Sequence, residues 1–132
     1  MFENDKVQQI EILNNVNADF IIINIAGDTV DWDYGNMVGT WLTGQTGRAR
    51  TIWNFPDATS IDLNSKNLMG ALLAPNASVT AQANIDGATA VANLTTDSEV
   101  HLPLPDFDCP DSDALPFTQS NDNIPVSYTH LR

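Results

Sequence analysis

Two stretches of the chain repeat one short pattern, the first beginning at Pro56 and the second at Pro75. Each has the proline, then Asp or Asn, an alanine and a hydroxyl residue, and each continues as an alternating run, in Pro56–Leu63 and Pro75–Ala81. A related phrase of small residues begins at Gly70 and again at Gly87. The interval between copies is irregular, 19 residues from Pro56 to Pro75 and 17 from Gly70 to Gly87. This length is close to that of one coil of a solenoid of short parallel strands, in which no coil can bury its inner face alone. The repeat therefore predicts stacked strands.

Alternation within each copy divides the side chains into inward and outward sets. Ile61 and Leu63 should face inward with Asp62 outward, because successive side chains of a strand point to opposite faces. Seven small residues are expected to keep the interior narrow: Ala74, Ala77, Ala81, Ala83, Ala88, Ala90 and Ala92. Any binding function should then lie on the outward Ser, Thr, Gln and Asp positions between them.

Two Pro-Asx pairs are typical of turns. Proline presets the first dihedral of a turn, and the following Asp or Asn side chain can bond to its own backbone two residues on. Pro56-Asp57 and Pro75-Asn76 are therefore predicted to be corners of the coil.

The first half of the chain also favours strands. Ile10–Ile12 alternates, and Phe20–Ile25 has the length and β-branching of a buried strand. A helix near residues 34–42 is compatible with the spacing of its apolar residues, and residues 43–47 are typical of a loop. The predicted fold class is all-β, a right-handed parallel β-helix (solenoid), optionally with one short covering helix near residues 34–42.

The 132 residues are enough for one core and too few for two ordinary domains. We expect a β-helical domain over residues 1–104, truncated at its N-terminal end, followed by an acidic linker rich in Pro and Asp over 105–125. Residues 126–132 resemble a translated sequencing-adapter tail and are excluded from the fold.

Charge excludes some partners. Asp and Glu total 17 against 5 Lys and Arg, for a net charge of −12, which repels nucleic acid and anionic membrane surfaces. No apolar run approaches the ~20 residues of a membrane span. The single Cys109 leaves no internal disulfide. Charged residues are only 17% of the chain, whereas Asn, Thr, Ser, Ala and Asp are abundant, a composition typical of extracellular β-proteins.

Five motifs, in their order and spacing, resemble the bacterial choice-of-anchor A domain: Ile52–Ser60, Gly70–Ser78, Asn84–Gly87, Val91–Asn93 and Glu99–His101. The resemblance implies an exported or surface-attached β-helical module, with adhesion as its usual suggested role and no catalytic residues to transfer. The chain departs from the family pattern after His101, which leaves the mode of anchoring open.

Candidate catalytic groups each have a simpler structural explanation. Asp57 and Asp62 could be a carboxylate pair for glycoside hydrolysis, but a turn and an outward strand position account for them. Outside the excluded tail, the basic residues that a polysaccharide lyase would need are restricted to Lys6, Arg48, Arg50 and Lys66. His101 has no Ser, Cys or metal partner at a recognisable spacing. We therefore assign no catalytic, cofactor-binding or metal-binding residue, and we expect the protein not to be an enzyme.

Two further patterns leave alternatives open. Asp106–Asp113 is rich in the oxygen ligands that calcium prefers, but it lacks the glycine and the final bidentate acid of an EF-hand loop, so an acidic linker is favoured. Trp32, Trp41 and Trp53 could form a sugar-stacking platform or fill the core.

The favoured function is a noncatalytic extracellular or cell-surface module that binds a protein or glycan through one face of the β-helix. The alternatives are a polysaccharide-active β-helical enzyme and an ice-binding-like protein. Ice binding requires outward hydroxyls that recur at one position of successive coils, and we expect the candidates not to do so: Ser60, Ser78, Thr80, Thr89 and Thr95.

Overall fold

The computed structural model describes residues 8–13, 18–33 and 35–102. These residues form short strands and two short helices: β1 (Gln9–Glu11), β2 (Ile21–Asn24), β3 (Thr29–Asp31), β4 (Asn36–Val38), α1 (Gly39–Thr43), α2 (Gln45–Ala49), β5 (Thr51–Asn54), β6 (Ser60–Asp62), β7 (Leu68–Met69), β8 (Ala71–Ala81), β9 (Ile85–Asp86), β10 (Thr89–Thr96) and β11 (Val100–His101). The predicted linker and tail, residues 105–125 and 126–132, lie outside the described residues, as do Lys6 and Cys109. No helix in the described part is long and apolar enough to cross a membrane.

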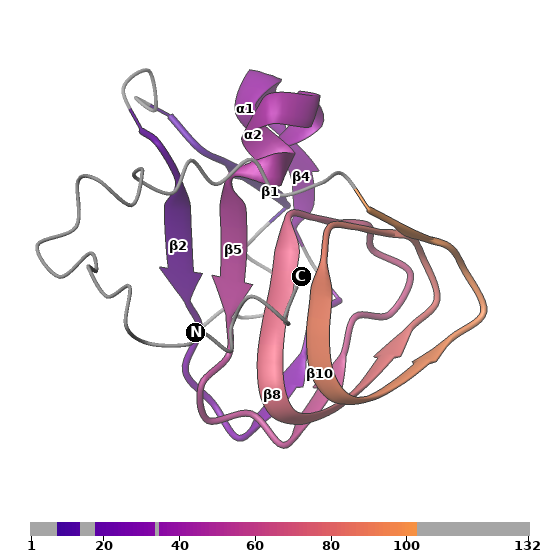
Figure 1. Ribbon diagram of the computed structural model, residues 1–132. Helices are drawn as coiled ribbons and strands as arrows, with labels where there is room; N and C mark the ends of the chain where they lie inside the picture. The colour runs from indigo at the N-terminus through magenta and orange to yellow at the C-terminus, as the bar shows by residue number, and fades with distance from the viewer. Residues whose placement is uncertain (1–7, 14–17, 34, 103–132) are drawn as a thin grey trace, which may run out of the picture.

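The strands pair in parallel throughout the described residues. They form a two-stranded sheet (β1, β4), a six-stranded sheet (β2, β5, β8, β6, β3, with β10 added to β8) and a three-stranded sheet (β11, β9, β7). In Figure 1, β2, β5, β8 and β10 run side by side, and β8 and β10 curl round at their lower ends. The prediction of an all-β protein with parallel sheets is confirmed.

The register of these pairs is close to the repeat in the sequence, with a shift of one residue between β6 and β8, where paired residues are 18 positions apart and the two prolines 19. Ile61 in β6 is the partner of Val79 in β8, and both were expected to face inward. Leu72 in β8 is the partner of Thr89 in β10, at the same spacing that separates Gly70 from Gly87. Copies of the repeat are therefore neighbouring parallel strands.

Only one of the two predicted corners is a turn between strands. Pro56 and Asp57 lie in a bend between β5 and β6, as predicted. Pro75 and Asn76 lie instead within β8, where both are exposed and interrupt the alternation of buried and exposed residues. At these two residues the alternation of buried and exposed side chains shifts by one position, and the strand bends without ending. The part of β8 before them pairs with β5, and the part after them pairs with β6.

The helical region differs from the prediction in its bounds. Residues 36–38 form β4, the first helix starts at Gly39, and the expected loop over 43–47 is largely replaced by α2. Gly39 has φ +87°, a conformation that glycine adopts without strain and that separates β4 from α1. Both helices lie at the upper end of β5 in Figure 1.

Aromatic residues fill the centre of the core. Trp32 and Trp53 are each 1% exposed, and the ring of Trp32 meets those of Trp53 and Phe55 edge-on, at centroid distances of 5.4 and 6.2 Å. The interior is thus wider than the alanine pattern suggested. Three of the seven predicted inward alanines are buried: Ala74, Ala77 and Ala81.

Two others of the seven alanines that were predicted to face inward lie at the surface. Ala90 and Ala92 are exposed, which corrects the prediction. The partner of Leu72 is Thr89, so Thr89 takes the inward position in β10 and its neighbour Ala90 faces outward. The prediction assumed that one alternation of inward and outward residues continues through every copy of the repeat, whereas the register shifts within β10.

The apolar run of β2 is only half buried. Phe20 and Ile22 are 52% and 50% exposed, whereas a fully buried strand was predicted. Among the described strands, β2 pairs with β5 alone, and its side chains alternate between the two faces. A long apolar run was therefore an insufficient signal of burial on both sides.

Candidate ligand-binding face

Neighbouring strands of the large sheet align their outward polar side chains in two columns. Positions are shared because consecutive strands pair in register. The first column contains Thr29, Ser60, Ser78 and Asn93, and the second contains Asp31, Asp62, Thr80 and Thr95. We call these eight residues the polar face. All are exposed except Asp62, which is half-buried.

The spacing of a parallel sheet makes this face a regular array. Neighbouring strands lie about 4.8 Å apart, and positions i and i+2 of one strand lie about 6.6 Å apart. Hydroxyl, amide and carboxylate groups therefore recur at fixed intervals in two directions. The inward residues between the columns anchor the array, since Ile61 and Val79 are 1% and 2% exposed.

Hydrogen bonds order parts of the polar face. The Asn93 side-chain amide donates to Ser78 Oγ at 3.2 Å across the β8–β10 pair. Asn64, just after β6, donates from its backbone N–H to Asp62 Oδ1 at 2.9 Å and from Nδ2 to Asp31 Oδ1 at 2.7 Å. The two carboxylates are thus held in place and still have oxygens available as acceptors.

The columns correct the prediction that outward hydroxyls share no position. Ser60 and Ser78 are direct partners, and Thr80 is the direct partner of Thr95. Thr89 is the exception, because it is half-buried on the inward side. The sequence offset that aligns these groups differs between the β6–β8 pair and the β8–β10 pair, so a fixed period could not find them.

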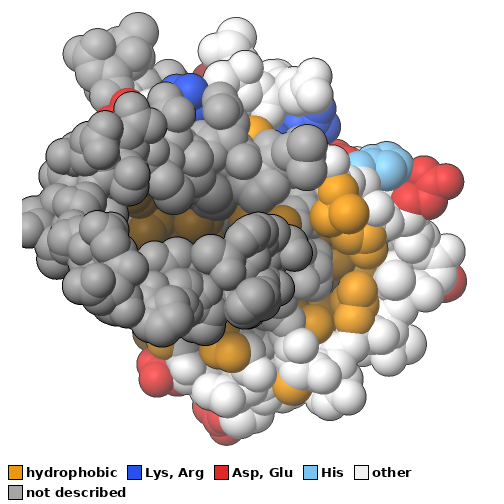
Figure 2. Space-filling view, in the orientation of Figure 1, with side chains coloured by type: hydrophobic (Ala, Val, Ile, Leu, Met, Phe, Trp, Pro, Cys, Tyr) orange, Lys and Arg blue, Asp and Glu red, His pale blue; other side chains and the backbone are white. Residues whose placement is uncertain are grey.

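A second outward surface of the sheet is apolar. A shallow pocket of about 200 Å³ over β5, β8 and β10 is lined by Ile52, Ala71, Leu72, Leu73, Ala88, Thr89 and Ala90. Figure 2 shows hydrophobic side chains gathered over β8 and β10. This surface has few hydrogen-bonding groups, so it differs in chemistry from the polar face.

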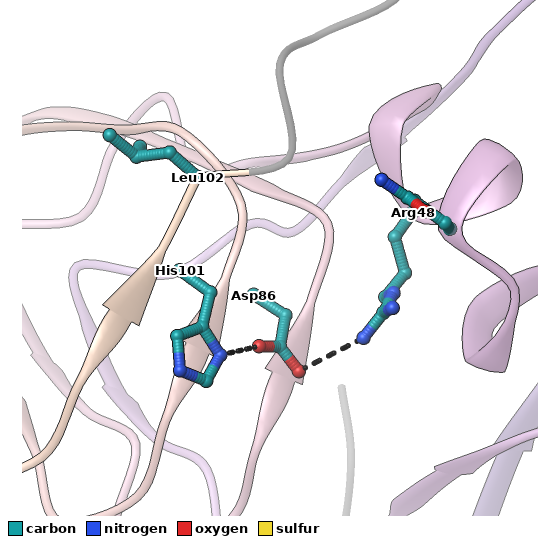
Figure 3. Close-up of a pocket in the computed structure, with 5 residues that line it drawn as sticks. Arg48, Asp86, His101 and Leu102 are labelled. Atoms are coloured by element: carbon teal, nitrogen blue, oxygen red, sulfur yellow. Dashed lines mark hydrogen bonds and ion pairs between the residues drawn. The ribbon is translucent and has the colours of Figure 1, made fainter.

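A cluster of ionisable side chains lies where α2, β9 and β11 meet. Asp86 Oδ1 is 2.6 Å from His101 Nδ1, and Arg48 Nη1 donates to Asp86 Oδ2 at 3.3 Å. Glu99 Oε2 is 2.7 Å from His101 Nε2. Figure 3 shows His101 and Arg48 approaching Asp86 from opposite sides. Gln45 and Leu102 complete a pocket of about 240 Å³ with Arg48, Asp86 and His101.

Hydrogen bonding governs the protonation of this cluster. The contact with Glu99, and after it the contact with Asp86, raise the pKa of His101 above its ordinary value of 6.5, because both favour the charged ring. Within the part of the chain that the structure describes, no Ser or Cys lines this pocket or contacts His101.

Comparison with known families identifies the family of the chain. A family model described as "Putative Ice-binding-like adhesive domain" matches residues 2–102. The chain belongs to this family. No curated protein and no solved structure was found to match it. Membership in the ice-binding-like adhesive domain family makes the chain a surface adhesive-type module, which acts on an external ligand from a surface or extracellular location.

The carboxylates predicted as a possible catalytic pair have separate positions in this adhesive domain. Asp57 is exposed in the bend between β5 and β6, and Asp62 lies in the second polar column with its Asn64 hydrogen bond. The basic candidates also have local partners: Arg48 pairs with Asp86, and Lys66 donates to Asn36 Oδ1 at 3.3 Å. Arg50 is half-buried at the end of α2.

The tryptophans do not form a sugar platform in this adhesive domain. Trp32 and Trp53 are core residues, and Trp53 Nε1 donates to the Met69 carbonyl at 2.8 Å. Trp41 is half-buried, and its Nε1 donates to Thr51 Oγ1 at 2.8 Å. The core alternative is therefore correct for Trp32 and Trp53. The possible calcium segment, Asp106–Asp113, lies outside the described residues.

The sequence analysis did not predict the contacts of His101 with Asp86, because no sequence motif links these residues. His101 is the register partner of Asp86, 15 residues earlier, and Arg48 is 38 residues from Asp86. The offset of 17 residues between Gly70 and Gly87, extended to the end of the domain, would have placed His101 two residues from the register position of Asp86. Nothing in the sequence indicated that Arg48 approaches from a helix.

Proposed function

We propose that this adhesive domain is noncatalytic and binds an extracellular glycan through its polar face. The observation that carries the proposal is the in-register alignment of Ser60 with Ser78 and of Asp62 with Thr80. Hydroxyl, amide and carboxylate groups can exchange hydrogen bonds with sugar hydroxyls. The polar face contains no Lys or Arg, so a neutral glycan suits it better than an acidic one.

We also propose the finer architecture, a right-handed parallel β-helix in which each coil contributes one row to this face. Parallel ladders at two places support it, since β5, β8 and β10 are consecutive neighbours, and so are β7, β9 and β11. The resemblance to the choice-of-anchor A domain stays a prediction beside the matched adhesive family, as do export, anchoring and a bacterial host.

A single bulky substitution tests the binding face. Thr80 is exposed and central in the second column, so Thr80→Tyr should block a flat ligand without disturbing the core. Ala90→Tyr is the matched control, because Ala90 is exposed on the apolar surface. Binding would be measured on an array of neutral and acidic glycans and on immobilised fibronectin and collagen. We expect Thr80→Tyr to weaken binding to neutral glycans by at least about tenfold, ~1.4 kcal/mol.

Three other results of this experiment would contradict the proposal. Binding to the matrix proteins alone would replace the glycan with a protein ligand. Loss of binding in Ala90→Tyr with none in Thr80→Tyr would move the site to the apolar surface. Release of reducing or unsaturated sugar ends, abolished by Asp57→Asn or Asp62→Asn, would make the protein an enzyme.

Ice is a second candidate ligand, because the polar face has the regular two-dimensional spacing that a crystalline surface requires. Thermal hysteresis and ice recrystallisation would be measured for the wild type, Thr80→Tyr and Ala90→Tyr. Activity that Thr80→Tyr alone abolishes would favour ice. Wild-type protein without activity in either assay would exclude it.

A further inference from the structure

His101 lies between two carboxylates, and the geometry defines its charge. Its Nδ1 and Nε2 are 2.6 and 2.7 Å from oxygens of Asp86 and Glu99. An ionised carboxylate only accepts hydrogen bonds, so both ring nitrogens must carry a proton to make both contacts. Neither neutral tautomer can do this. The observed arrangement is that of an imidazolium ion.

The cluster connects two strands and a helix. Asp86 belongs to β9 and is held from α2 by Arg48, while Glu99 immediately precedes β11. The Asp86 side chain is only 11% exposed, so its charge is poorly solvated and depends on Arg48 and His101. The charged groups that face His101 are thus Asp86 from β9 and Glu99 from its own segment, with Arg48 behind Asp86.

We propose that His101 is a pH-sensitive lock that fastens β11 to β9 while its ring is doubly protonated and releases β11 when the ring loses a proton. Losing a proton removes one of the two hydrogen bonds. Release follows when Nδ1 is the nitrogen that loses it, because the Asp86 carboxylate then faces a nitrogen lone pair, whereas Nε2 contacts Glu99 on the segment of His101 itself. Among the described residues, β11 and β9 share two register pairs, and the Ile85 amide adds a hydrogen bond to the Glu99 carbonyl at 3.1 Å. The contact between His101 and Asp86 is therefore one of a small number of interactions that join the two strands. The lock lies outside the polar face, so it goes beyond adhesion and does not depend on it.

The protonation state can be measured directly by nitrogen NMR of the imidazole rings. The chain has two histidines, and His130→Gln leaves the His101 ring as the only signal. We expect the titration midpoint to lie above 6.5 and both ring N–H groups to be present below that midpoint. Glu99→Gln removes the negative charge of one of the two carboxylates, at an exposed position, and should lower the midpoint. Asp57→Asn removes the same charge from the bend between β5 and β6 and should leave it unchanged.

Hydrogen exchange tests whether protonation holds the strand. The Ile85 amide donates to the Glu99 carbonyl at 3.1 Å beside the β9–β11 pair, and the Leu63 amide donates to the Thr80 carbonyl at 2.8 Å beside the β6–β8 pair of the six-stranded sheet. Their protection ratio cancels the general effect of pH on exchange. We expect the ratio of Ile85 to Leu63 protection to fall several-fold as pH rises through the His101 transition, and to be flat in His101→Gln. A wild-type ratio that is independent of pH, or a His101 midpoint at or below 6.5, would overturn the proposal.

Discussion

Gly87 lies against the backbone of Gly70, its counterpart in the preceding copy of the repeat. A Cβ atom at position 87 would overlap the Gly70 carbonyl group, and it would lie 2.6 Å from the amide nitrogen of Ala71. Gly70 itself has φ +126°, and a Cβ there would lie 2.9 Å from the Thr51 carbonyl oxygen. The repeated glycine is therefore required where the backbones of successive strands approach closely.

Gly87→Ala should destabilise the domain because the atoms it would displace belong to the backbone. We expect a loss of at least about 1–3 kcal/mol in the free energy of unfolding, as for other overpacked sites. Urea denaturation followed by tryptophan fluorescence measures it. Ala90→Ser, at an exposed position of the following strand, should change stability by no more than about 0.5 kcal/mol. Equal effects of the two substitutions would contradict the close approach.

Two adjacent leucines provide a matched test of which face of β8 is buried. Leu72 is 1% exposed and Leu73 is 38% exposed. Leu72→Ala should cost about 2–5 kcal/mol through lost burial and the cavity left behind. Leu73→Ala removes the same atoms from a partly solvated position and should cost less than about 1 kcal/mol. Similar losses, measured by thermal and urea unfolding, would show that the strand faces are assigned wrongly.

The repeat predicted the parallel strands but not their exact paths. Alternation within the two copies assigned Ile61 and Val79 to the same inward face, and they are register partners. This succeeded because a buried apolar residue at the same position of each copy gives a regular pattern in the sequence. Pro75 was misjudged since a turn signal and a bend within a continuous strand look alike locally. The sequence predicted that binding residues would lie among the outward polar positions. Which of these residues align in columns could be seen only from the register of the strands. The His101 cluster brings together residues of two strands and a helix, a combination that local spacing in the sequence does not encode.

Ala81→Leu tests the packing on the inward side of the end of β8. Ala81 is buried with 1% exposure, and it pairs in register with Thr96. The three additional carbon atoms should overpack the interior and cost about 1–3 kcal/mol. Gln82→Leu is the control, because Gln82 is the next residue and is exposed. An unchanged melting temperature for Ala81→Leu would indicate free space that the structure does not contain.

The free energy of unfolding should depend on pH through the protonation of His101. Hydrogen bonds to Glu99 and Asp86 raise its pKa in the folded protein above the ordinary 6.5 expected for the unfolded chain. The folded state then binds more protons, so the stabilisation is complete below pH 6.5 and is lost as pH rises through the folded pKa. The free energy of unfolding of the wild type relative to His101→Gln should therefore be greatest near about pH 6 and should fall toward zero at alkaline pH. Urea unfolding of both proteins across this range measures the difference. A difference that grows with pH would mean that the neutral ring is the stabilising form.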